Sequence, residues 1–261
     1  MTAMTLQLER RRSGTPRTTR RPRRRRRWWL RIVVVVVVLV AVLAALFGVL
    51  LAATPSVRSA PALVARELAA NHAPSDQGVV PYKVATALLA TEDSRFYSDP
   101  ALDPQGTARA LWGLVSHNPN EGGATIEVQL AKMLYTPGRS DPVALAEQVA
   151  LAFKLDWAFT KKQILAMYLD AAYFGDGAYG VTQAAQHYFG RSPSALTWGQ
   201  ASLLAGLVQA PSAYNPAHHL SMALLRRNHV LDRLVAVGAL TSSQAQAIQN
   251  RPLYPAIRFS G

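Results

Sequence analysis

The sequence predicts an almost wholly α-helical domain behind one N-terminal membrane-spanning helix. Apolar residues recur at helical spacing along most of the chain beyond residue 79, and no run shows a convincing period of two. Three Thr-x-x-Gln boxes, of the kind that open helices, begin at Thr160, Thr197 and Thr241. The chain has 261 residues, 50% of them hydrophobic, and no cysteine, which suffices for one sizeable domain or two small lobes without disulfides.

The formal net charge of +13 is concentrated in the first 31 residues. These carry 12 Arg and one Glu, a charge of +11, so the rest of the chain carries +2. Such an arginine-rich segment with few apolar residues is typical of disorder, and we predict a disordered tail over 1–31. A nucleic-acid-binding arm is the alternative. The position of the tail beside an apolar span argues against it, so we expect no nucleic-acid partner and instead attraction to anionic lipid headgroups.

Residues 32–53 form 22 consecutive positions without a charge or a proline. As a helix this segment is about 33 Å long, which matches a hydrocarbon core of about 30 Å. Trp28 and Trp29 lie where an interfacial aromatic belt is expected, and the positive-inside rule places the arginines in the cytoplasm. We therefore predict a single-pass anchor, with everything from Thr54 onward outside the cytoplasm. A cleaved signal peptide is the alternative, and the long tail and long apolar run argue against it.

The remaining elements follow in chain order. Residues 54–78 carry three prolines around a short helical run at 62–70, and we predict a linker there. A folded domain is predicted at 79–250, with a short tail at 251–261. A short apolar segment at 106–115 is either core or a lipid-facing surface. The predicted helices of the domain are 79–97, 124–134, 141–157, 160–171, one ending at 189, 197–208, 220–237 and a terminal one from 241.

A carboxylate closes the first long helix of the domain. On a helix, Glu92 shares a face with Ala85, Leu88 and Leu89, so it points inward. Burial and the negative end of the helix dipole both raise the pKa of such a carboxyl, which suits an acid or base in a cleft. The alternative is an Asp/Glu pair that ends a helix at the surface.

The predicted helix at 124–134 has a polar stripe opposite its core face. Thr125, Gln129 and Lys132 lie at i, i+4 and i+7. The glycine pair 122–123 feeds the start of this helix, where free N–H groups and the helix dipole favour an anion, and Lys132 adds a charge for a phosphate. An ordinary amphipathic helix is the alternative. Gln148 is a further polar group on a largely apolar helix face.

These segments resemble, in order, the motifs of family-51 peptidoglycan glycosyltransferases in their membrane-anchored, monofunctional form. The resemblance covers about residues 79–248. The segments that carry it are Glu92-Asp93-Ser94-Arg95-Phe96-Tyr97, Gly122-Gly123-Ala124-Thr125-Ile126-Glu127-Val128-Gln129-Leu130-Ala131-Lys132, 161–169, Tyr173-Phe174-Gly175-Asp176-Gly177-Ala178-Tyr179-Gly180, Tyr188-Phe189-Gly190, Gln209-Ala210-Pro211 and Tyr214-Asn215-Pro216.

The resemblance implies a lysozyme-like, two-lobed α fold on the outer face of the bacterial plasma membrane. Its implied substrate is lipid II, which it polymerises into glycan strands with inversion, and Glu92 is the implied general base. No cofactor or metal ligand is implied, and whether a divalent cation (Mg²⁺ or Mn²⁺) accompanies the pyrophosphate stays open, as does partnership with a transpeptidase or other cell-wall synthesis proteins. The implied substrate-binding residues are Asp93, Phe96, Thr125, Gln129, Lys132 and Gln148.

The chain departs from the family pattern mainly at the third motif. Ala144, Leu145 and Gln148 stand where the family has Arg, Lys and Glu, and Glu127 replaces a small hydroxyl residue. Loss of one electrostatic stabiliser costs about 10²–10³ in rate. A catalytically impaired lipid II-binding scaffold or regulator is therefore a second hypothesis, and a lytic enzyme that cleaves glycan strands is a third. The sequence contains no Ser-x-x-Lys or Lys-Thr-Gly, so we expect no transpeptidase activity.

Overall fold

The structure is a computed structural model, and it describes residues 23–75, 78–98 and 124–251. The chain divides into two compact units at residues 46 and 47. The first unit contains most of helix α1 (Arg23–Ala53). Within α1, the segment Trp28–Ala53 contains an 18-residue window with a mean hydropathy of 3.4 and no buried side chain, so by length and composition it is able to cross a membrane. The predicted anchor thus has a matching helix, but this helix begins at Arg23, inside the tail predicted to be disordered. Arginine is a good helix former, so the valine-rich helix extends into the arginine run.

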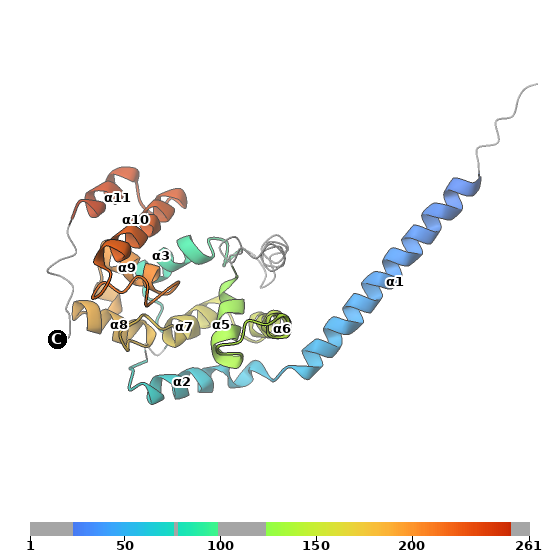
Figure 1. Ribbon diagram of the computed structural model, residues 1–261, viewed down its shortest axis with the longest axis horizontal. Coiled ribbons are helices and arrows are strands. Elements are labelled where there is room, and N and C mark those ends of the chain that lie inside the picture. The colour runs from blue at the N-terminus through green and yellow to red at the C-terminus, as the bar shows by residue number, and fades with distance from the viewer. Residues whose placement is uncertain (1–22, 76–77, 99–123, 252–261) are drawn as a thin grey trace, which may run out of the picture. The chain divides into compact units, whose positions relative to one another are not determined.

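The second unit is helical, which confirms the predicted all-α class. Among the described residues, β pairing is limited to an isolated bridge between Tyr173 and Tyr179. The lysozyme-like, two-lobed arrangement stays a prediction. The helices, shown in Figure 1, are η1 (Val57–Ser59), α2 (Ala60–Ala70), α3 (Tyr82–Glu92), α5 (Ile126–Tyr135), α6 (Pro142–Ala158), α7 (Lys161–Ala171), α8 (Gly180–Phe189), η2 (Pro193–Ala195), α9 (Trp198–Leu207), α10 (Leu220–Ala236) and α11 (Ser242–Gln249).

Local sequence signals set several of these helix ends. The boxes at Thr160, Thr197 and Thr241 are all formed: each Thr hydroxyl accepts from the backbone N–H three residues on, and the Gln side chain returns to the Thr N–H. After α10, Gly238 adopts a φ of +77°, the left-handed conformation that ends many helices. These short-range predictions are confirmed.

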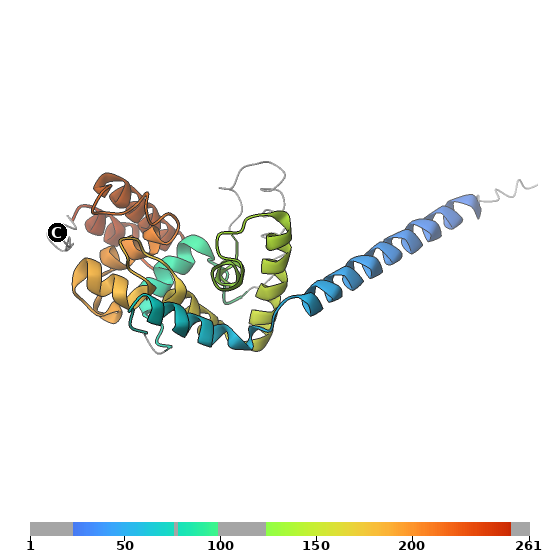
Figure 2. The ribbon, with the colours of Figure 1, turned by 60° about the horizontal axis from the view of Figure 1, so that its bottom comes forward.

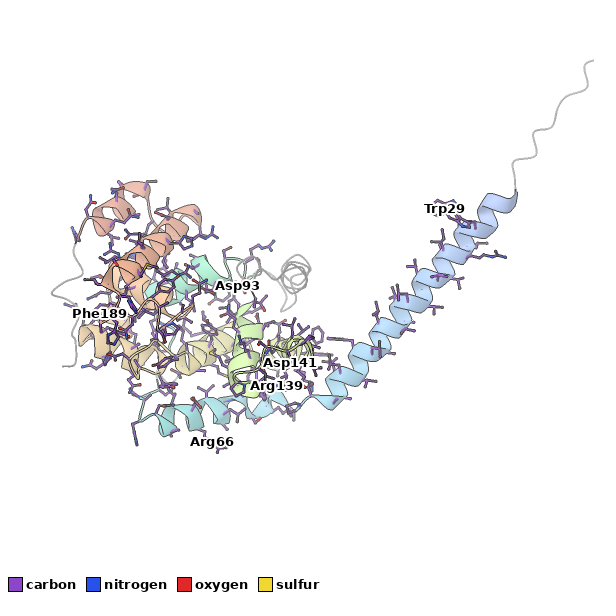
Figure 3. All side chains as sticks on the ribbon, in the orientation of Figure 1. Trp29, Arg66, Asp93, Arg139, Asp141 and Phe189 are labelled. Atoms are coloured by element: carbon purple, nitrogen blue, oxygen red, sulfur yellow. The ribbon has the colours of Figure 1, made fainter. Side chains whose placement is uncertain are left out.

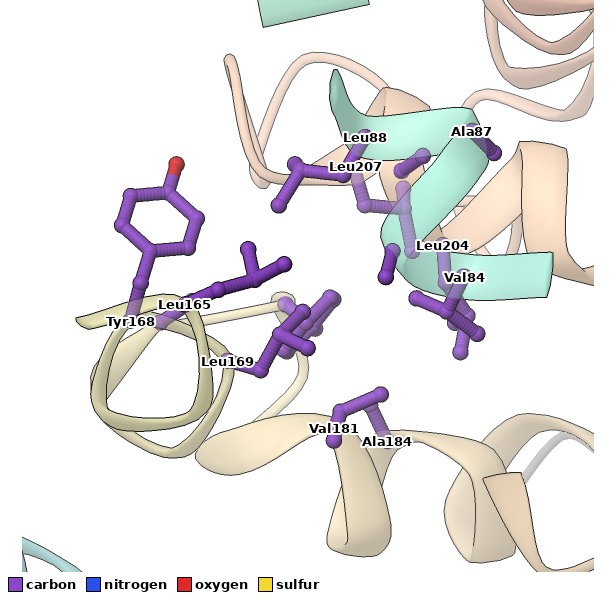
Figure 4. Close-up of a cluster of buried hydrophobic side chains, with 14 of the residues drawn as sticks. Val84, Ala87, Leu88, Leu165, Tyr168, Leu169, Val181, Ala184, Leu204 and Leu207 are labelled. Carbon is purple, nitrogen blue, oxygen red and sulfur yellow. The ribbon is translucent and has the colours of Figure 1, made fainter. Parts of the chain in front are cut away.

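The hydrophobic core lies where α3, α9 and α10 pack side by side, an arrangement seen in both Figure 1 and Figure 2. Helices α7 and α8 complete it from the other side. Figure 4 shows Val84 and Leu88 of α3 facing Leu204 and Leu207 of α9, with Leu169 of α7 nearby. All five side chains are at most 1% exposed, so α3 is held on several sides and its last residue, Glu92, has a defined position.

The segment predicted as a linker, 54–78, is instead part of the folded unit. Ala60, Val64 and Leu68 are buried and lie at i, i+4 and i+8, which gives α2 one apolar face that packs toward α7. The three prolines of this segment are typical of a linker and obscure this short apolar pattern. Pro61 lies in the first turn of α2, where its missing N–H costs nothing. The packed domain therefore begins before the predicted residue 79.

A cavity of about 540 Å³ separates part of α2 from α7. Neither Glu92 nor Gln129 lines it, so this cavity is not the site that the sequence predicts. Its lining is mostly apolar and includes Val64, Leu68, Phe159, Met167 and the carboxylate of Asp170.

Candidate active site

The first long helix of the domain ends at Glu92, five residues earlier than predicted. Asp93 leaves the helical conformation, with φ −155° and ψ 75°. Its carboxylate oxygen Oδ2 accepts a hydrogen bond from the N–H of Ile126 at 3.2 Å. This bond needs Asp93 to turn away from the helix, and it ties the end of α3 to the start of α5. Figure 3 labels Asp93 at this junction.

Glu92 is inward-facing, as its helix position predicts, and it has two hydrogen-bond partners in the described part of the chain. The guanidinium Nη2 of Arg226, on α10, donates to Glu92 Oε1 at 3.1 Å. The amide Nε2 of Gln129, on α5, donates to Oε2 at 3.5 Å. Burial raises the pKa of Glu92 above its usual value, while the charge of Arg226 and the Gln129 hydrogen bond act in the lowering direction. The Glu92 side chain is 15% exposed, so water or a substrate hydroxyl has limited access to its carboxylate.

Two further hydrogen bonds fix the orientation of the Gln129 amide. Its Nε2 donates to the carbonyl of Ala124 at 2.9 Å, and its Oε1 accepts from the Tyr168 hydroxyl at 2.7 Å. Burial raises the pKa of Tyr168, and the nearby Glu92 adds to that shift, so the hydroxyl stays protonated and donates. In Figure 4 the hydroxyl oxygen of Tyr168 points away from the apolar cluster. Because the Tyr168 hydroxyl donates its hydrogen, it pairs with the amide oxygen of Gln129, and the NH₂ group on the other side of the amide is directed toward Glu92.

A second group of charges joins the start of α5 to the start of α7. Glu127, 1% exposed, accepts from Lys161 Nζ at 2.6 Å, and Lys161 also pairs with Asp156 at 2.9 Å. Lys161 Nζ lies 5.0 Å from the centroid of the Phe96 ring, within range of a cation–π contact. Burial raises the pKa of Asp93 to about 6; the Ile126 N–H and Lys161 oppose the shift and Glu127 adds to it. Asp93 is therefore an acid whose pKa burial moves toward neutrality.

The structure brings Glu92, Asp93 and Gln129 together and places the other predicted residues around them. Thr125 is the N-cap of α5 and accepts from the Val128 N–H. Phe96 is 2% exposed and packed in the core, so it offers a substrate almost no surface here. Lys132 is exposed and makes no ion pair within the described part of the chain.

Gln148 lies near the far end of α5. It is 4% exposed, and its Nε2 donates to Thr136 Oγ1 at 2.8 Å and to the Arg139 carbonyl at 3.5 Å. Seven residues of α5 separate Gln129 from Thr136, which is about 10 Å along a helix axis. Gln148 therefore does not touch the Glu92 cluster. Arg139, labelled in Figure 3 beside Asp141, pairs with Asp141 and Glu147 at the surface.

Arg226, Tyr168 and Lys161 are site residues that the sequence did not predict as such. Arg226 lies 134 residues from Glu92, and nothing in its local pattern marks it. Tyr168 reads as a core aromatic on α7. In the sequence, Glu127 stands out only as a replacement of a small hydroxyl residue of the family pattern, and its pairing with Lys161 required the packing of α5 on α7.

Two predicted features lie outside the described residues: the apolar segment 106–115 and the glycine pair 122–123. Within the described ranges there is no group of three or more His, Asp or Glu side chains that could hold a metal ion. The Glu127 carboxylate, whose charge acts on Asp93, is already paired with Lys161.

Comparison with known proteins finds one family across this domain. A family model described as Transglycosylase matches residues 62–235. Penicillin-binding protein 1A of Aquifex aeolicus is 40% identical over 177 residues, and that of Escherichia coli is 37% identical over 187. The matches cover 67% and 69% of this chain but 24% and 22% of those relatives, so this chain spans about a quarter of their length.

A second kind of relative matches along nearly its whole length. A putative transglycosylase of Cupriavidus necator is 33% identical over 213 residues, covering 82% of this chain and 90% of its own. A solved structure of penicillin-binding protein 1A from Haemophilus influenzae aligns with 72% of this chain and 18% of its own, at 23% identity and a TM-score of 0.43, which is too low to define the fold.

Proposed function

Since this chain belongs to the transglycosylase family, the family-51 glycosyltransferases of peptidoglycan synthesis, we propose that it polymerises lipid II into glycan strands by inverting transfer. Glu92 is the proposed general base. Its carboxylate takes the proton of the acceptor sugar's 4-hydroxyl, and that oxygen bonds to the donor's anomeric carbon. As this bond forms, the bond from the anomeric carbon to the undecaprenyl pyrophosphate breaks on the opposite face, and the pyrophosphate leaves with the electron pair.

The observation that carries this proposal is the environment of Glu92. Its carboxylate ends a buried helix, is partly shielded from water, has a raised pKa, and is held by Arg226 and Gln129. A base works best when its pKa lies closer to the operating pH than that of a free carboxyl. The alternative of a structural helix-end acid does not need the directed amide of Gln129.

The leaving pyrophosphate requires positive charge and N–H donors. In the proposal these come from the start of α5, capped by Thr125, and from Lys132, whose side chain is exposed and unpaired within the described ranges. A divalent cation held by the pyrophosphate oxygens is compatible with this, because Mg²⁺ is commonly bound through substrate phosphates. Adding EDTA, then Mg²⁺ or Mn²⁺, to the assay below tests the requirement.

A catalytically impaired lipid II-binding scaffold is the second candidate, and the region of the third motif favours it. Ala144 is fully buried and Gln148 is hydrogen-bonded inside the protein, so neither position supplies charge to a substrate. The two candidates share a binding site and differ only in turnover.

Polymerisation of lipid II by the purified full-length protein in detergent separates them, with strand products resolved on a gel. We expect strands from the wild type and none from Glu92→Gln. Glu67→Gln, an exposed carboxylate on α2, is the matched control and should retain activity. Absence of strands under all conditions, with lipid II still bound in a sedimentation assay, would favour the scaffold.

Gln148→Glu tests whether the missing carboxylate limits turnover. The change removes the NH₂ group that donates to Thr136 and turns a carboxylate oxygen toward the Arg139 carbonyl, so we expect about 1–3 kcal/mol of destabilisation. If the missing carboxylate is limiting, the rate per folded molecule rises. An unchanged rate in correctly folded protein would exclude that explanation.

The proposed orientation places the arginine tail in the cytoplasm and the domain outside it, at the bacterial plasma membrane. Because the chain has no cysteine, single cysteines report each side without background. Ser194→Cys, in the domain, should react with a membrane-impermeant maleimide in intact spheroplasts, and Ser13→Cys only after lysis. The opposite pattern would reverse the orientation.

A further inference from the structure

The ion pair between Arg226 and Glu92 joins two helices that are far apart in sequence. The Arg226 side chain is 11% exposed, and its Nη2 donates to Glu92 Oε1 at 3.1 Å. Its guanidinium carbon lies 5.8 Å from the centroid of the Tyr214 ring, so one face of the cation rests on an aromatic surface. The cation is therefore held from two directions, and its position relative to the carboxylate is defined.

Gly206, on α9, leaves the space through which Arg226 reaches Glu92. A Cβ atom at this position would lie 2.8 Å from Arg226 Cγ, which is closer than real Cβ contacts allow. Alanine is intrinsically better than glycine in a helix, so helix formation gives no reason for glycine here. The close approach of the Arg226 stem gives one.

Arg226 also carries an unpaired donor. Its Nε atom is buried and has no hydrogen-bond partner among the described residues. Leaving a buried donor unpaired is unfavourable, and a native protein rarely keeps one without a reason. Among the described residues, the side-chain hydrogen bond that Arg226 makes is the one from Nη2 to Glu92.

Among the residues that the structure describes, few other charged or titratable groups face Glu92. From α10, Arg233 donates to the Ala90 carbonyl, and burial lowers the pKa of His229, with Arg226 and Arg233 adding to the shift. Helix α9 carries no titratable side chain. Tyr168 of α7 stays protonated, and α5 presents the neutral amide of Gln129. Asp93 is the adjacent acid and is turned toward α5.

We propose that Arg226 is the positioning residue of Glu92: it sets the direction of the carboxylate and keeps it ionised, and Gly206 is the residue that admits it. The role of this pair in the reaction rests on the proposed function, since it requires Glu92 to act as the base. The pairing itself does not depend on turnover. Without Arg226, the desolvated carboxylate holds its proton to higher pH and cannot accept one from a substrate hydroxyl.

The test is a pH titration of the Glu92 carboxyl carbon by NMR in full-length protein labelled with ¹³C-glutamate in micelles. The chain has six glutamates, and Glu92→Gln assigns the signal. We expect Arg226→Met to move the titration midpoint of Glu92 to higher pH, Arg226→Lys to restore part of the difference, and Gly206→Ala to give an intermediate midpoint because it displaces the arginine stem.

Arg233→Met is the matched control. Arg233 lies two turns along the same helix and anchors α3 through a backbone carbonyl, so its loss should lower the melting temperature without moving the Glu92 midpoint. An unchanged midpoint in both Arg226→Met and Gly206→Ala would overturn the proposal. If Arg226→Met does not fold, Gly206→Ala and Arg226→Lys decide it by the same measurement.

The pH profile of polymerisation supplies a second readout. In Arg226→Met the loss of kcat/KM should be about tenfold larger on the acidic limb than on the plateau, since a base must be ionised to act. A uniform loss at all pH values would mean a structural role and would overturn the proposal. If Glu92→Gln still polymerises lipid II, the proposed base is wrong, whereas the NMR result for Arg226 is unaffected.

Discussion

Lys161→Met should destabilise the protein far more than the removal of its partner, Glu127→Gln. The two side chains form an ion pair at 2.6 Å, but their surroundings differ: Glu127 is 1% exposed and Lys161 is 22% exposed. Lys161 also has Asp156 at 2.9 Å, so it keeps a countercharge when Glu127 is neutral. Glu127, by contrast, would be left as a buried charge without a cation.

The magnitudes follow from this asymmetry. Removing one partner of a buried ion pair costs about 3–5 kcal/mol, and we take about 3 kcal/mol for Lys161→Met because its end of the pair is partly hydrated. Glu127→Gln should cost about 1 kcal/mol, as for an exposed pair. For a domain of this size these values correspond to melting temperatures lowered by about 6–12 °C and about 2–4 °C.

Thermal unfolding followed by circular dichroism in detergent measures both variants. In the Glu127→Gln background, Lys161→Met should cost about 1 kcal/mol, so the double-mutant cycle should show strong coupling. Lys162→Met, at the exposed neighbouring position, removes the same charge and should change the melting temperature by less than about 2 °C. If Lys161→Met costs no more than Glu127→Gln, the buried-charge reasoning is refuted.

Three further predictions concern Asp93, Gly180 and Thr160. Folding raises the pKa of Asp93 from 3.8 to about 6, so between these pH values the folded state binds more protons than the unfolded state. The stability of the wild type relative to Asp93→Asn should therefore fall as the pH rises from about 4 to 6. Because Asp93 is partly exposed, this change should be about 1–2 kcal/mol, measured by unfolding at each pH; a constant difference would contradict it. Gly180→Ala should cost at least about 2 kcal/mol, because φ is +74° and the new Cβ would lie 3.0 Å from a carbonyl oxygen. Gly177→Ala has the same φ but open space around the Cβ, so it should cost about 1 kcal/mol. Equal losses of stability in urea unfolding would show that the contact with the carbonyl oxygen costs nothing. Thr160→Ala removes the N-cap of α7 and should cost about 1 kcal/mol by the same assay, whereas Thr160→Ser should be close to neutral.

The sequence predicted the features that depend on neighbouring residues. Hydrophobic runs at a helical period indicated the all-α class, and the boxes at Thr160, Thr197 and Thr241 marked helix starts that the structure forms. The inward direction of Glu92 followed from residues three, four and seven positions away. Such signals are short in range, so a single sequence contains them in full.

The predictions failed where a contact distant in sequence decides the outcome. The first helix of the domain ends at Glu92 because Asp93 turns to accept from Ile126, 33 residues away. The segment with α2 reads as a proline-rich linker until its apolar face is placed against α7. Gln148 shares a predicted substrate role with Gln129; packing puts it at the opposite end of α5, and its role stays a prediction.

By itself, then, the sequence determined that this chain carries an apolar helix long enough for a membrane, a helical domain, and a carboxylate turned inward at a helix end. Only the tertiary structure decided which charges surround that carboxylate. Arg226 reaches Glu92 from 134 positions away through the space left by Gly206, and Tyr168 directs the Gln129 amide toward it. The physical reason is that the electrostatics of a buried acid depend on distances of a few ångströms between different helices, and these distances exist only after the helices have packed.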